Sequence, residues 1–179
     1  MPPSLKLNAV AFVSPQNHPI LIRTFNNQDE HAIKYHYIAH TSLDVIEERG
    51  EFSIRRIICV QLIFSVAAAG KAFECYLGLL FTMEDVAVYG YITPLKVKII
   101  LALALSDAVV KDAEIITIFK ALHMAYYSSV SNPFLKLETV GDSSSDQATI
   151  LAVGSPKWKL FRRRVDDINW AVGNLNSLT

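Results

Sequence analysis

The chain has 179 residues, which suits one domain of ordinary size and is short for two independent hydrophobic cores. Hydrophobic residues make up 51% of the chain, and 17 basic residues balance 17 acidic ones. A chain without net charge lacks the positive surface of general nucleic-acid binders, so we expect no nucleic-acid partner. Its apolar and neutral composition is typical of proteins that associate with others.

Targeting and redox signals are few. Cys59 and Cys75 are too few for a disulfide framework or a cysteine zinc site, and they indicate reduced thiols in the cytosol. The N-terminal residues do not have the pattern of a secretory signal. The apolar run Ile57–Ala69 is shorter than the roughly 20 residues that a membrane-spanning helix needs. It predicts a buried or interfacial helix and no transmembrane span.

The first third of the chain predicts a hairpin followed by a helix. Leu5–Val13 and Ile20–Thr24 are strand-like, and turn-forming residues lie between them. The helix is expected from about Glu30 to Arg49, with its end near Gly50. Apolar residues at three- and four-residue spacing predict its buried stripe, which comprises Tyr35, Ile38, Ala39, Ser42, Leu43 and Ile46.

Another face of this helix is polar. His36, His40, Asp44 and Glu48 follow one another at four-residue spacing. Two histidines one turn apart can share a metal ion, but Tyr37 follows His36 where a zinc-protease motif has glutamate, and no fourth ligand is evident. We therefore expect no metal site here and interpret the face as solvated or partner-facing.

The rest of the chain predicts three strands and two helices. The strands are Cys75–Phe81, Val86–Ile92 and Leu95–Leu105, joined by short breaks as in an antiparallel meander. In the third strand Lys96 and Lys98 alternate with apolar residues, which predicts one solvent-facing side. The helices are Lys111–Val130 and Lys157–Asn174, with inward residues Ile115, Phe119, Leu122 and Tyr126 in one and Trp158, Phe161, Val165 and Ile168 in the other.

This order of elements, β-β-α-β-β-β-α-α, predicts a single α+β domain over residues 1–179 with a five-stranded antiparallel sheet. Segment 138–156, rich in glycine and serine, is expected to be a flexible loop.

Known catalytic motifs are absent from the sequence: Gly70-Lys71 lacks the rest of a phosphate-binding loop, and there is no Gly-x-Ser-x-Gly elbow. We expect no enzyme activity and no cofactor. The basic residues Lys157, Lys159, Arg162, Arg163 and Arg164 form either a solvated helix face or a contact for phospholipid or an acidic partner.

Several segments together resemble one protein family. Ile33–Glu48 (IKYHYIAHTSLDVIEE) resembles the first helix of sedlin-type proteins, and Tyr76–Thr93 (YLGLLFTMEDVAVYGYIT) resembles the middle hairpin of sedlin's paralogue. Phe119–His123 and Ser131–Phe134 are similar to the end of the family's second helix, and Phe161 and Val165 match the spacing of its last helix. The resemblance covers most of the chain outside 50–73 and 135–157.

The resemblance implies a longin-like (SNARE-like) fold with one helix on one face of the sheet and two on the other. It implies a non-catalytic adaptor subunit of a TRAPP complex, which tethers vesicles in ER–Golgi and Golgi–endosome transport and as a whole promotes nucleotide exchange on a Rab GTPase. The expected partners are other TRAPP subunits, and the expected location is the cytoplasm, peripheral at those membranes. A longin-type adaptor or SNARE regulator outside TRAPP is the alternative.

The resemblance also implies a binding surface. Asp44 matches the family's first-helix aspartate, a position linked to partner contacts, so His40, Asp44, Glu47 and Glu48 are the expected interface residues. Segment 50–73 departs from the family pattern because it is longer and apolar. It is either a real insertion or an artefact of the gene model, such as an unspliced intron, and sequencing the transcript distinguishes the two.

Overall fold

The computed structural model describes residues 5–25, 32–63, 75–105, 110–138, 151–155 and 159–175. Within these ranges strands and helices alternate much as the sequence predicts. The elements in chain order are β1 (Leu7–Val13), β2 (Pro19–Thr24), α1 (Ala32–Ile63), β3 (Tyr76–Met83), β4 (Val86–Ile92), β5 (Lys98–Ala104), α2 (Asp112–Val130), α3 (Pro133–Glu138) and α5 (Lys159–Leu175).

The five strands form one antiparallel sheet in the order β2-β1-β5-β4-β3. β1 and β2 form the predicted hairpin, and β3, β4 and β5 form the predicted meander. β1 joins the two parts by pairing with β5, for example Val10 with Leu101. The α+β fold class and the predicted element order are confirmed, with the short helix α3 as an addition that the sequence reading missed.

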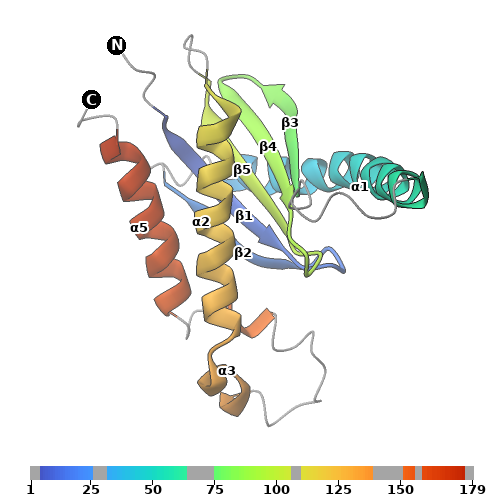
Figure 1. Ribbon diagram of the computed structural model, residues 1–179. Coiled ribbons are helices and arrows are strands. Elements are labelled where there is room, and N and C mark those ends of the chain that lie inside the picture. The colour runs from blue at the N-terminus through green and yellow to red at the C-terminus, as the bar shows by residue number, and fades with distance from the viewer. Residues whose placement is uncertain are drawn as a thin grey trace.

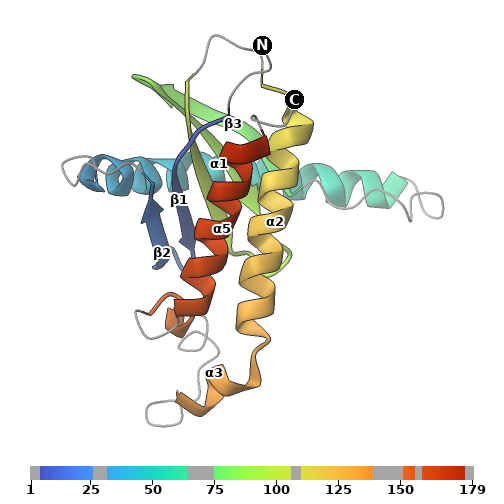
Figure 2. The same ribbon diagram turned by 90° about the vertical axis from the view of Figure 1, so that its left-hand side faces the viewer.

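Helices cover both faces of the sheet (Figures 1 and 2). α1 lies on one face, and α2 and α5 lie antiparallel to each other on the other. Side chains of β1 alternate between the two layers, so Val10 and Phe12 pack under α2 and α5, whereas Ala9 and Ala11 pack under α1. The predicted stripes of α1 and α2 are buried throughout. In α5, Phe161 and Val165 are buried, while Trp158 lies outside the described residues.

The helix α1 is longer than predicted. It continues through Gly50 to Ile63, and its second half extends beyond the sheet past β3 (Figures 1 and 2). The predicted end at Gly50 is wrong because a glycine inside a helix costs only about 1 kcal/mol relative to alanine, and the residues that follow include no proline. Thus the first part of the atypical segment 50–73 is helical, and its remainder, 64–73, lies outside the described residues. Across the described residues, no helix is both long and apolar enough to cross a membrane.

The strand β5 has no solvent-facing side, contrary to the prediction from its lysines. It begins at Lys98, and six of its seven residues are buried. The alternation of lysine with apolar residues predicted a solvent-facing side, but β5 is the central strand of a sheet that is covered on both sides. Lys96 lies in the preceding turn and is exposed, whereas Lys98 is 8% exposed and finds polar partners.

The predicted flexible loop at 138–156 lies largely outside the described residues, which include 151–155. This short piece packs closely against β2. Val153 is buried in the layer beneath α2 and α5. A Cβ atom built on Gly154 would lie 1.6 Å from the carbonyl oxygen of Ile20, so glycine is required for this approach. The end of the segment is therefore packed against the sheet.

Candidate partner-binding surface

The exposed face of α1 carries the predicted interface residues. His40, Asp44, Glu47 and Glu48 are all exposed, and His40, Asp44 and Glu48 lie on the side of the helix opposite the buried stripe. His40, Asp44 and Glu48 follow one another at four-residue spacing, so they form one row. The structure thus brings three of the predicted residues together on a single accessible surface.

Two apolar residues extend this row toward the start of α1. Ile33 is 79% exposed and Tyr37 is 63% exposed. Spacings of four, three and four residues place Ile33, Tyr37, His40 and Asp44 on one face. The sequence reading missed Ile33 and Tyr37, although their position outside the buried stripe was a usable signal. We call Ile33, Tyr37, His40, Asp44 and Glu48 the α1 surface row.

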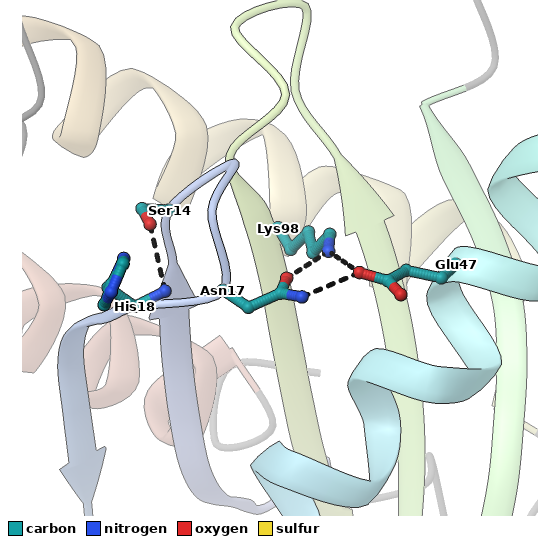
Figure 3. Close-up of polar contacts among 5 residues, drawn as sticks. All are labelled: Ser14, Asn17, His18, Glu47 and Lys98. Carbon is teal, nitrogen blue, oxygen red and sulfur yellow. Dashed lines mark hydrogen bonds and ion pairs between the residues drawn. The ribbon is translucent and has the colours of Figure 1, made fainter.

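Glu47 differs from the other predicted residues because its carboxylate already has partners (Figure 3). Its Oε1 atom accepts a hydrogen bond of 2.7 Å from Asn17 and one of 2.9 Å from Lys98. The ammonium group of Lys98 also donates to the side-chain oxygen of Asn17. These contacts hold α1 against β5 and the β1–β2 turn, so Glu47 supports the position of the helix on the sheet.

The geometry of the β1–β2 turn places Asn17 for this role (Figure 3). The backbone of Asn17 has a φ of 66°, a left-handed conformation that asparagine tolerates better than most residues. Ser14 closes the turn, because its hydroxyl oxygen accepts from the His18 backbone N–H at 3.0 Å. The Asn17 amide can then donate to Glu47 and accept from Lys98 at once. Hydrogen bonds from Asn17, and then the Lys98 contact, lower the pKa of Glu47.

The α1 surface row presents apolar and acidic side chains to solvent. In the described part of the chain, no group of three or more His, Cys, Asp and Glu side chains is placed to hold a metal ion. A small cavity of about 10 Å³ between α1 and the sheet is lined by alanines, isoleucines and the ring of Tyr35. Such a lining lacks the acid and base pair that proton-transfer chemistry needs.

The predicted basic cluster begins with Lys157, which lies outside the described residues, and its members on α5 are divided between structural and exposed residues. Arg162 donates to the carbonyl oxygen of Gly154 at 3.0 Å, and Asp166, which follows the cluster, pairs with Arg23 of β2. Lys159 and Arg163 remain at the surface. Within the cluster, Arg162 therefore ties α5 to the 151–155 turn, which packs on β2.

Comparison with known proteins agrees with the family that the sequence segments resemble. The sedlin family model matches residues 12–153, a range that includes all of α1. The chain is 37% identical to trafficking protein particle complex subunit 2-like protein of Bos taurus over 129 residues, which covers 70% of this chain and 80% of the relative. The protein of that name from Dictyostelium discoideum is 37% identical over 136 residues, which covers 73% of this chain and 84% of the relative. The chain therefore belongs to the sedlin family.

Proposed function

We propose that this protein is a non-catalytic assembly subunit of a TRAPP vesicle-tethering complex, and that the α1 surface row binds a neighbouring subunit. Relatives that are 37% identical to it over 129 and 136 aligned residues carry the name of a subunit of that complex. The observation that supports this binding surface is the exposure of the row on α1, which combines the apolar Ile33 and Tyr37 with the acidic Asp44 and Glu48.

The chemistry of the row defines the partner surface that fits it. Tyr37 brings a large apolar ring with a polar end, a side chain often found at the centre of protein interfaces. Asp44 and Glu48 lie one turn further along and favour basic groups on the partner. We therefore infer a partner surface with an apolar pocket beside arginine or lysine side chains.

The wider role follows from membership of the complex. The assembled complex, and not this chain alone, supports nucleotide exchange on a Rab GTPase during ER–Golgi and Golgi–endosome transport. The chain then reaches Golgi, ER–Golgi and endosomal membranes from the cytoplasm as part of the assembly. Other TRAPP subunits are its direct partners.

The test is purification of the tagged protein from cells, followed by mass spectrometry of what accompanies it. We expect other TRAPP subunits with the unchanged protein and a loss of at least about tenfold with Asp44→Tyr, which corresponds to about 1.4 kcal/mol. The matched control is Asp167→Tyr, because Asp167 is an exposed aspartate on α5, away from the row.

Two results overturn the proposal. If the unchanged protein brings down no TRAPP subunit, membership of the complex is wrong. If Asp44→Tyr keeps its partners, the α1 surface row is not the interface. Where circular dichroism shows that Asp44→Tyr is unfolded, Tyr37→Ala decides instead, because truncation of an exposed side chain leaves the core intact.

A further inference from the structure

β3 is an edge strand of the sheet and is interrupted twice. It lies last in the order β2-β1-β5-β4-β3, and no strand pairs with its outer side within the described residues. Its register with β4 shifts between Tyr76 and Gly78 and again between Leu79 and Phe81. Leu77 and Leu80 therefore have no residue opposite them on β4, as expected at β-bulges.

The side chain of Arg49 donates hydrogen bonds to backbone carbonyl groups at both interruptions. Nη1 of Arg49 donates to the carbonyl oxygen of Leu79 at 2.5 Å and to that of Leu77 at 3.3 Å, and Nη2 donates to that of Leu80 at 3.2 Å. Arg49 reaches them because α1 passes over the sheet at β3 before it runs beyond the edge (Figure 1). A planar guanidinium with two terminal nitrogens is suited to hold several acceptors at once.

Without the Arg49 contacts, β3 would be prone to pair with another strand. Tyr76–Met83 contains neither a charged residue nor a proline, so nothing in it repels an identical strand. Leu79 is 43% exposed. The opposite edge is protected differently, since the 151–155 turn packs on β2 and Arg23 of β2 pairs with Asp166. Each edge of the sheet is thus held by a contact from a helix or a loop.

We propose that Arg49 guards the β3 edge: it holds the strand in a bulged form, and its removal opens β3 to antiparallel pairing with β3 of a second copy of this chain. Free edge strands are a known route to self-association, and bulges are one of the means of blocking it. This inference concerns the isolated chain and is independent of the proposed function.

The test is the dimer dissociation constant of the purified full chain, measured by sedimentation equilibrium. We expect Arg49→Ala to lower it at least tenfold relative to the unchanged protein, with added hydrogen-exchange protection at the amides of β3. The control Arg163→Ala, on exposed Arg163 of α5, should leave it unchanged. Adding Leu79→Lys to Arg49→Ala should reverse the effect, because lysine on an edge strand opposes pairing.

Three results overturn the proposal. An unchanged dissociation constant in folded Arg49→Ala means that Arg49 does not guard the edge. Dimerisation that Leu79→Lys fails to reverse means that another surface pairs. If Arg49→Ala does not fold, Arg49→Lys decides, since a single ammonium lacks the two separate terminal nitrogens with which the guanidinium contacts Leu79 and Leu80. We expect an intermediate fall in the constant for that variant, and no fall overturns the proposal.

Discussion

The side-chain nitrogen of Lys98 lies 2.9 Å from Oε1 of Glu47, and this contact joins the central strand to the first helix across 51 residues of sequence. The Lys98 side chain is 10% exposed, whereas that of Glu47 is 54% exposed. A buried ammonium needs an acceptor for its charge. Glu47 supplies it from the surface, with Asn17 alongside (Figure 3).

Neutralising Glu47 should therefore destabilise the fold. We expect Glu47→Gln to lower the free energy of unfolding by about 1–2 kcal/mol, a modest value because the carboxylate is half exposed. Chemical denaturation followed by circular dichroism measures it. Glu48→Gln is the matched control, since Glu48 is an exposed neighbour on α1, and we expect a change within about 0.5 kcal/mol. Equal effects of the two substitutions would contradict the assigned role of Glu47.

The same contact predicts a dependence on pH. The hydrogen bond from Asn17 and the Lys98 contact lower the pKa of Glu47 in the folded state. A lowered carboxyl pKa stabilises the fold fully above the ordinary glutamate value of about 4.3, and the stabilisation is lost as pH falls through the folded-state pKa. The difference in unfolding free energy between the unchanged protein and Glu47→Gln should therefore shrink below about pH 4.3.

Comparing these two proteins at each pH removes other titrations. Burial lowers the pKa of His123, so that histidine also costs stability as pH falls below its ordinary range. His123 is present in both proteins and cancels from the difference. A difference that stays constant from neutral pH to pH 3 would show that the Glu47 carboxylate does not carry the effect.

The ion pair between β2 and α5 should make a smaller contribution. Nε and Nη2 of Arg23 lie 2.8 and 3.0 Å from the two carboxylate oxygens of Asp166. Both side chains are about two fifths exposed, at 43% and 39%, so solvent screens the pair. We expect Asp166→Asn to cost about 0.5–1 kcal/mol of unfolding free energy. Asp167→Asn, at the neighbouring exposed residue, should cost less unfolding free energy. Thermal melts of both variants at low and high salt measure this difference.

Two glycines should respond to alanine in opposite directions. At Gly154 a Cβ atom would overlap the Ile20 carbonyl oxygen, so the packed turn must shift, and we expect a loss of about 2–3 kcal/mol. At Gly173, in α5, a Cβ atom meets no atom within 4 Å. Alanine there should raise the free energy of unfolding by about 0.5–1 kcal/mol. A neutral Gly154→Ala would mean that residues 151–155 do not pack on β2.

The sequence predicted the regular elements well, because their signals are local. β4 has the predicted bounds, Val86–Ile92, and the buried stripes of α1 and α2 follow from apolar residues at helical spacing. The end of α1 was misplaced because a glycine signals a helix end only when nothing else continues the helix. Exposure of His40 and Asp44 was also predictable, since residues opposite a buried stripe face solvent.

By itself, the sequence determined the order of strands and helices, the residues that face the core and the family, because periodicity and short motifs belong to neighbouring residues. Only the tertiary structure decided that Lys98 is buried, that Glu47 neutralises its charge and that Arg49 donates hydrogen bonds to three carbonyl groups of β3. Each of these facts depends on which strand lies at the centre or edge of the sheet and where α1 crosses it. Such positions arise from contacts between distant segments, which no local pattern encodes.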